Sequence, residues 1–294
     1  MKRNMQQWMA ETIANPKKKG MPLPSYTVPG TPRSLPVPPR YTPEAVSQEA
    51  LIHEEAEADA LQVPRVGDGR TGECVRGIRL ASEWITDRPV LAGIIGPYSL
   101  AGRLLDMTEI MILCYEEPEM VETVLEKVTR FQIAYAKAFK EAGADGICMA
   151  EPAAGLLSPA LIDEFSTPYV QRIRQAVEDE NFLVMYHNCG NVVPLMENMS
   201  AIDASAYSFG NAIDIEEALK VLPADRMVLG NIDPAGTIRN GDPKQVYAET
   251  LMLLERCGRY PNFVISSGCD IPAMAPLDNI QAFFDAVETF YGRR

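Results

Sequence analysis

The sequence lacks a basic surface and any long apolar run, and both absences limit what the protein can bind. Lysine and arginine number 27 against 40 acidic residues, which gives a net charge of −13. Basic surfaces bind nucleic acids and anionic membranes, so neither is expected as a partner. No apolar stretch approaches the roughly 20 residues that a membrane-spanning helix needs. Polar residues interrupt the basic N-terminus where a signal peptide would have its apolar core, so we expect a cytoplasmic protein.

Cysteine and the common cofactor motifs are also scarce. Six cysteines in 294 residues are too few for a disulfide scaffold. No Gly-x-Gly-x-x-Gly follows an expected strand, and no lysine-bearing phosphate loop occurs, so a dinucleotide-binding fold has no support. No internal repeat of solenoid length is present. The remaining composition, 47% hydrophobic and 23% charged, is that of an ordinary globular protein.

The first 54 residues differ from the rest of the chain. Residues 4–15 have the pattern of a short amphipathic helix, and many of the 23 prolines lie between residues 21 and 43. Proline fixes φ and removes a hydrogen-bond donor, so this stretch is predicted to be an extended arm. A helical pattern returns over residues 44–61. We therefore expect an N-terminal helix and proline-rich arm over 1–54, followed by a single domain over 55–294.

Strand and helix patterns alternate through the second part of the chain. The expected strands are 90–95, 146–150, 182–186, 204–208, 226–230 and 262–266. The expected helices are 71–86, one after Gly96-Pro97, 118–142, 158–178, 214–222, 242–256 and 276–291. The strands are too apolar to be half exposed, which favours a parallel sheet covered on both sides. Six such units after an irregular start predict an α/β fold of the TIM (β/α)8-barrel type with a shortened or irregular N-terminal part.

Two of the expected strands end in a cysteine beside a glycine. His187 and Cys189 follow strand 182–186, and Cys269 follows strand 262–266 some 80 residues later. The carboxyl ends of parallel barrel strands open on one face, so these side chains are expected to meet. Two thiolates and one imidazole are a ligand set that zinc prefers, with a fourth position left open.

A simpler interpretation is that His187 is a core histidine and the cysteines are spectators. His-x-Cys alone would favour it, but the matching Gly268-Cys269 at a second strand end favours the metal. A zinc ion with two thiolate ligands has little positive charge to spare, so it is suited to holding a third thiolate as a nucleophile towards soft electrophiles such as methyl groups. The other cysteines, which lie among apolar neighbours, are expected to be core residues: Cys74, Cys114, Cys148 and Cys257.

Five further polar residues follow expected strands. Glu151 is predicted to support the metal or handle protons, or else to cap a helix or form a salt bridge. Asn231 and Asp233 are pocket candidates, although Asp before Pro is also an ordinary turn signal. Tyr98 would line the pocket with a phenol or simply pack in the core. Asn211 is a weaker candidate for binding.

These pieces together resemble the uroporphyrinogen decarboxylase superfamily. More narrowly, they resemble the zinc- and cobalamin-dependent methyltransferases grouped with methylcobalamin:coenzyme M methyltransferase. The resemblance covers residues 55–294 and rests on Gly96-Pro97-Tyr98-Ser99-Leu100-Ala101, Glu151-Pro152, Leu157-Ser158-Pro159, His187-Asn188-Cys189-Gly190, Gly230-Asn231-Ile232-Asp233-Pro234 and Gly268-Cys269-Asp270-Ile271-Pro272. The His-x-Cys with a distant Gly-Cys is typical of the methyltransferase branch, whereas the Gly-Pro and Leu-Ser-Pro pieces are shared more widely.

The resemblance implies a barrel that holds zinc through the histidine and two cysteines named above. It implies a thiol or tetrahydrofolate-type acceptor at the open zinc position and a methylated corrinoid (methylcobalamin) as donor, carried by a separate corrinoid protein. Glu151, Asn231 and Asp233 would act at this site, and Tyr98 and Asn211 would bind substrate or cofactor.

The chain departs from the family pattern in two places. The proline-rich arm stands where relatives have their early barrel strands. The residues Ser208-Phe209-Gly210-Asn211 stand where some methyltransferases have an acidic residue. Two alternatives are uroporphyrinogen decarboxylase itself, an enzyme of porphyrin biosynthesis, and a non-catalytic corrinoid-binding homologue. True decarboxylases have an arginine-rich N-terminal motif that is missing here, and they have no need for His-x-Cys.

Overall fold

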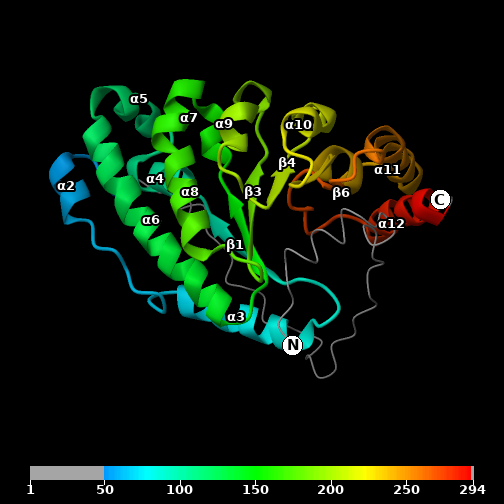
Figure 1. The fold of residues 1–294 in the computed structure, drawn as a ribbon, viewed down its shortest axis with the longest axis horizontal. Helices are drawn as coiled ribbons and strands as arrows, with labels where there is room; N and C mark the ends of the chain where they lie inside the picture. The colour runs from blue at the N-terminus through cyan, green and yellow to red at the C-terminus, as the bar shows by residue number, and fades with distance from the viewer. Residues whose placement is uncertain (1–49, 293–294) are drawn as a thin grey trace.

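The computed structural model describes residues 50–292, which form a parallel sheet with helices between its strands (Figure 1). The strands are β1 Leu91–Ile95, β2 Gly146–Ala150, β3 Leu183–Asn188, β4 Ala206–Phe209, β5 Met227–Ile232 and β6 Phe263–Ser267. Each strand pairs in parallel with the next one in the sequence. All six expected strands are confirmed, and the α/β class with them.

Most helices match the expected pattern, but the helices expected over 44–61 and 158–178 differ, and the helices Glu109–Glu116 and Met196–Ser200 were not expected. They are α2 Glu55–Ala60, α3 Thr71–Trp84, α4 Pro97–Leu105, α5 Glu109–Glu116, α6 Pro118–Glu141, α7 Pro159–Phe165, α8 Thr167–Val177, α9 Met196–Ser200, α10 Ile215–Val221, α11 Pro243–Cys257 and α12 Leu277–Gly292, with the shorter turns η3 Pro152–Leu156, η4 Val193–Leu195 and η5 Pro234–Arg239. The single helix expected over 158–178 is divided at Ser166, because Pro168 in the first turn of α8 cannot donate to a preceding carbonyl. The start at Ser158 is confirmed, since its side chain accepts from Leu161 N.

The expected helix over 44–61 is wrong for residues 50–54. There the backbone N–H groups of Leu51 and Ile52 donate to Leu104 O at 2.8 and 3.1 Å, so tertiary contacts take the donors that a helix would use. Helix α2 begins only after Glu54. The helix expected at 4–15 and the proline-rich arm lie outside the described residues.

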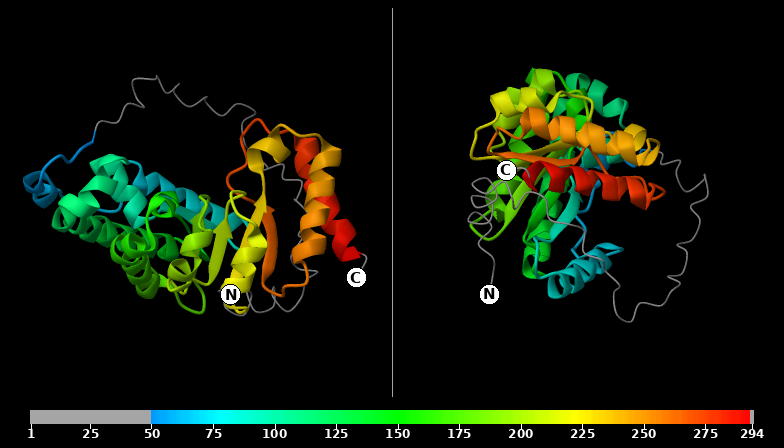
Figure 2. Two further views of the ribbon diagram at one scale, coloured as in Figure 1. Left: turned by 90° about the horizontal axis from the view of Figure 1, so that it is seen from above. Right: turned by 90° about the vertical axis from the view of Figure 1, so that its right-hand side faces the viewer.

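The two faces of the sheet have different environments. Successive side chains of a strand point to opposite faces. On β1, Ile94 faces the helices and is 7% exposed, whereas Ile95 faces the other way and is 36% exposed. Helices α6 and α8 lie along one end of the sheet and α11 and α12 along the other (Figures 1 and 2). The main core therefore lies between sheet and helices, while the inner face has only a small cluster around Leu183, Ala206 and Met227.

The six strands between residues 50 and 292 do not close into a barrel. The order runs from β1 to β6, and these two strands are the unpaired edges of the sheet. A barrel of the TIM type has eight strands, so six strands in the same order leave it open. No helix of the described part is both long enough and apolar enough to span a lipid bilayer.

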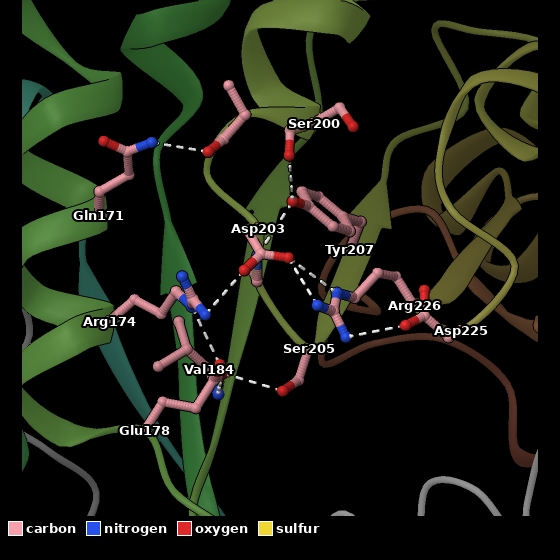
Figure 3. Close-up of polar contacts among 12 residues, drawn as sticks. Gln171, Arg174, Glu178, Val184, Ser200, Asp203, Ser205, Tyr207, Asp225 and Arg226 are labelled. Carbon is pink, nitrogen blue, oxygen red and sulfur yellow. Dashed lines mark hydrogen bonds and ion pairs between the residues drawn. The ribbon is translucent and has the colours of Figure 1, made fainter.

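A charged network joins the starting ends of three strands (Figure 3). Asp203, which has a φ of 58°, accepts from Arg226 Nη2 at 2.6 Å and pairs with Arg174 Nη2 at 2.8 Å. Arg174 also pairs with Glu178, whose Oε2 accepts from Ser205 Oγ at 2.9 Å. These contacts lie at the end of the sheet opposite the strand termini that carry His187 and Cys269. They therefore stabilise the sheet and lie away from the strand ends where a functional site is expected.

Candidate metal centre

The structure brings His187, Cys189 and Cys269 together, as the sequence predicted. His187 lies in β3, Cys189 follows that strand, and Cys269 follows β6. One ligand atom from each side chain lies within 4.8 Å of the others, and Cys269 Sγ is 3.7 Å from His187 Nε2. We call these three residues the metal-ligand group.

The separation of Cys269 and His187 in the metal-ligand group fits a zinc ion. Zinc binds nitrogen at about 2.0 Å and sulfur at about 2.3 Å, usually as a tetrahedron. The edges of such a tetrahedron are about 3.3 to 3.8 Å long by the same bond lengths. The separation of 3.7 Å between Cys269 Sγ and His187 Nε2 falls within that range. Three protein ligands leave one corner of a tetrahedron for another molecule.

The electrostatics of the group favour a cation between its members. Burial lowers the pKa of His187, although the nearby Asp270 opposes this, and the lowered pKa favours the neutral imidazole that donates a lone pair to a metal. Burial and the neighbouring Cys269 both raise the pKa of Cys189. Two thiolates so close together repel each other unless a positive ion lies between them. The site is therefore poorly suited to hold its thiolates without a metal.

Two residues that sequence reasoning did not single out orient the ligands. Ser208 Oγ lies 3.1 Å from His187 Nδ1, which leaves Nε2 directed at Cys269. Asn188, fully buried, donates from Nδ2 to Glu151 O at 2.6 Å and accepts at Oδ1 from Gly190 N at 2.9 Å. Such partners fix ring orientation and the turn that presents a ligand. The pairing of His187 with Ser208 depends on strand register, which no local pattern reveals.

Glu151 lies behind the strand ends and is fully buried. Its Oε1 accepts from Tyr98 N at 2.7 Å and Ser99 N at 3.2 Å, so it caps the first turn of α4. A Cβ on residue 96 would lie only 1.5 Å from Glu151 Oε2, so Gly96 makes room for this carboxyl. Burial raises the pKa of Glu151 to about 8. These contacts are those of the helix-capping alternative, and a role in proton handling stays a prediction.

Tyr98 and Asp233 also have structural contacts. Tyr98 is fully buried, and its hydroxyl lies 3.8 Å from Cys114 Sγ, so the structure does not bring it to the metal-ligand group. Asp233 Oδ1 accepts from Ala235 N and Gly236 N, both at 2.8 Å, and caps η5. For both residues a binding or catalytic role remains a prediction.

Asn231 and Asn211 lie in or beside the loop that follows β4. Asn231 is buried and donates from Nδ2 to two carbonyls of that loop, Gly210 O at 2.9 Å and Ile213 O at 2.8 Å. Asn211 is exposed and lies against Gly268, the residue before Cys269. Asn211 is thus an exposed residue whose backbone lies close to the cysteine-bearing turn after β6.

The remaining cysteines divide by burial. Cys114 and Cys257 are buried, as expected for core residues, and Cys148 is half-buried on the inner face of β2. The expectation of a core position is wrong for Cys74, which is exposed. It lies on α3, a helix with no buried residue, and Figure 1 shows this helix below the strands.

Residues 39–290 match the family model described as uroporphyrinogen decarboxylase (URO-D). The chain therefore belongs to this family, and the resemblance inferred from its motifs is confirmed.

Within the family, curated relatives of two kinds are similar to this chain. Methylcobamide:CoM methyltransferase MtbA of Methanosarcina mazei is 27% identical over 235 residues, which are 79% of this chain and 68% of that protein. Methylcobamide:CoM methyltransferase MtaA of Methanosarcina barkeri is 31% identical over 238 residues, 80% of this chain and 67% of that protein. Uroporphyrinogen decarboxylase of Anaeromyxobacter dehalogenans is 29% identical over 245 residues, which are 81% of this chain and 69% of that protein. Each match thus spans about two thirds of the relative's length.

Solved structures show the same fold. A methyltransferase from Methanosarcina mazei superposes with a TM-score of 0.72 at 28% identity, covering 79% of this chain and 69% of that chain. A B12-independent methionine synthase from Shewanella sp. W3-18-1 superposes with a TM-score of 0.56 at 14% identity, covering 74% of this chain and 65% of that chain. At this low identity the match shows a similar fold and nothing about function. The parallel sheet described here is therefore of the type found in the Methanosarcina mazei methyltransferase.

Proposed function

We propose that this protein is a zinc-dependent methyltransferase that moves a methyl group from a methylated corrinoid to a thiol or similar acceptor. The observation that carries the proposal is the convergence of His187, Cys189 and Cys269 at the ends of two strands. The relatives named methylcobamide:CoM methyltransferase support a corrinoid as donor. By analogy with those relatives, the corrinoid arrives on a separate protein, and the acceptor is coenzyme M or another small nucleophile.

Each residue of the site has a role in this chemistry. Zinc, when bound, lowers the pKa of an acceptor thiol and so keeps it as the thiolate. Cys189 and Cys269 supply two negative charges, so the ligand set favours a soft, thiolate-like nucleophile over a strongly polarised water. Ser208 orients the imidazole of His187 through Nδ1. Asn211 is exposed beside Gly268, the residue before Cys269, and is our candidate for contact with the acceptor.

The first test is the metal content of the protein and its dependence on the two cysteines. We expect about one zinc ion per chain in protein purified without added metal, and a loss of affinity of at least about tenfold in Cys189→Ser and Cys269→Ser. Cys74→Ser, which alters an exposed cysteine, is the matched control and should bind zinc like the wild type. Wild-type protein that takes up no zinc would refute the proposal.

The second measurement is methyl transfer itself. Methylcobalamin is offered with coenzyme M, homocysteine or tetrahydrofolate, and methylated products are measured by mass spectrometry. We expect product with one acceptor and none with the two cysteine variants. Zinc binding without transfer to any acceptor would instead favour a non-catalytic corrinoid-binding homologue.

Uroporphyrinogen decarboxylase activity is the second candidate, because relatives with that name are 27 to 30% identical to this chain. That reaction needs cationic groups for the substrate's several carboxylates, and it has no use for a pair of thiolates facing a histidine. Release of carbon dioxide from uroporphyrinogen, unchanged in Cys269→Ser, would identify the protein as a decarboxylase.

A further inference from the structure

The backbone of the loop after β4 lies directly against Cys189. Gly210 N donates to Asn188 O at 3.1 Å and so extends the pairing of β3 with β4 beyond Phe209. A Cβ on residue 210 would lie 2.6 Å from Cys189 Cα and 2.8 Å from Cys189 Cβ. These separations are shorter than side chains tolerate, so only glycine fits at this position.

The same loop is in contact with Gly268 on its other side. A Cβ on Gly268 would lie 2.7 Å from Asn211 N and 3.2 Å from the Gly210 carbonyl carbon. Gly268 immediately precedes Cys269, and its own N–H donates to Ile232 O at 2.7 Å. The Gly210–Asn211 peptide is therefore held between the backbone of one metal-ligating cysteine and the residue before the other.

Asn231 fixes the position of this peptide. Its buried Nδ2 donates to Gly210 O at 2.9 Å and to Ile213 O at 2.8 Å, so both amide hydrogens are used on the loop. Aspartate has the same shape but no donor when ionised, and it would set a carboxylate oxygen against two carbonyl oxygens. Asn231→Asp should therefore release the loop without changing the volume of the side chain.

We propose that the Gly210–Asn211 peptide is a spacer that sets the separation of the two metal-ligating sulfurs, and that Asn231 is the positioning residue that holds the spacer. The inference rests on the proposed metal site and names the residues that give it its geometry. Metal sites have to be held to within about 0.5 Å. A methyl group on residue 210 would have to move Cys189 from 2.6 Å to the 3.4 Å of ordinary contact, which exceeds that tolerance.

One test of the spacer needs no metal. The sulfurs of Cys189 and Cys269 lie within 4.8 Å of each other, so diamide should join them as a disulfide in metal-free wild type, detected by peptide mass spectrometry. Gly210→Ala and Asn231→Asp should give clearly less of this disulfide under the same conditions. Gly93→Ala is the matched control, because a Cβ there meets nothing within 4 Å.

The second test measures metal binding in the same variants. Zinc affinity, obtained by competition with a chromophoric chelator, should fall about 10- to 100-fold in Gly210→Ala and Asn231→Asp. At saturation with Co²⁺, both variants should show weaker sulfur-to-metal charge-transfer absorption than wild type and Gly93→Ala. If Gly210→Ala does not fold, Asn231→Asp carries the test alone.

The outcomes separate the spacer from the proposed function. Wild-type disulfide yield and wild-type zinc affinity in both variants would overturn the spacer. Lower disulfide yield in the variants, together with a wild type that binds no zinc, would support the spacer and refute the zinc-dependent function.

Discussion

Glu151 is a carboxylic acid that the fold removes from water. Its Oε2 has no hydrogen-bond partner, and its Oε1 accepts two backbone N–H groups of α4. Burial favours the neutral form, and this raises the pKa to about 8 in spite of those hydrogen bonds. A buried acid in this state contributes a pH dependence to stability that an exposed acid does not.

We expect the stability of the wild type to fall as pH rises from about 4.5 to about 8. In that range the native protein keeps a proton on Glu151 that the unfolded chain has released, so the free energy of unfolding decreases with pH by about 1.4 kcal/mol per unit of the pKa shift. Glu151→Gln keeps an acceptor for the α4 donors and should remove this component. Urea unfolding at pH 5.5 and 8.5 checks it, with Glu73→Gln, an exposed residue, as the control. Parallel pH profiles for wild type and Glu151→Gln would contradict the prediction.

At the level of elements, Asp203 links α8 with the turns that precede β4 and β5. It has a left-handed backbone conformation and is 46% exposed, so its ion pairs with Arg174 and Arg226 are partly screened by water. Asp203→Asn, which tolerates the same backbone, should cost about 1 kcal/mol of unfolding free energy. Asp203→Ala should cost about 1 kcal/mol more, because a Cβ without a polar group is disfavoured at positive φ.

Urea unfolding at low salt and in 1 M NaCl measures both effects. Salt should shrink the cost of Asp203→Asn and leave the difference between Asn and Ala unchanged. Asp225→Asn is the control, because Asp225 is 74% exposed and contacts only the outer side of Arg226; its effect should stay within about 0.5 kcal/mol. Equal costs for Asn and Ala would show that the backbone conformation contributes nothing.

The elements that could be predicted from the sequence are those whose pattern lies within a few neighbouring residues. The apolar strands, the helix start at Ser158 and the strand exits before Cys189 and Cys269 each depend on neighbouring residues, and all are confirmed. The contact of Ser208 with His187 depends on how two strands align, so no local pattern shows it.

Two features could not be predicted from the sequence because they depend on tertiary packing. The helical pattern before residue 55 was wrong because Leu104 O takes the backbone donors of Leu51 and Ile52. The two interpretations of Glu151 stayed open because its burial depends on Gly96, which lies 55 positions away in the chain.

For the molecule as a whole, the open sheet predicts that substitutions on its two faces cost different amounts of unfolding free energy. Ile94 and Ile95 are neighbours of the same type on β1, but Ile94 packs under the helices and Ile95 is 36% exposed on the inner face. Ile94→Ala should cost about 3 kcal/mol through the lost burial and the cavity left behind. Ile95→Ala should cost about 1 kcal/mol, because less apolar surface returns to water. Thermal or urea unfolding compares the pair directly, and equal costs would show that the inner face is covered in solution.

The metal-ligand group joins residues that are 82 positions apart, one in β3 and one after β6. An ion bound there acts as a cross-link, and it removes from the unfolded chain the freedom of a very long loop. Strands β4 and β5 lie inside that loop, so a bound ion would limit how far they can move from β3 and from the end of β6. An ion bound at the metal-ligand group would then also restrain the opening of this part of the sheet, and it would slow amide-proton exchange along these strands.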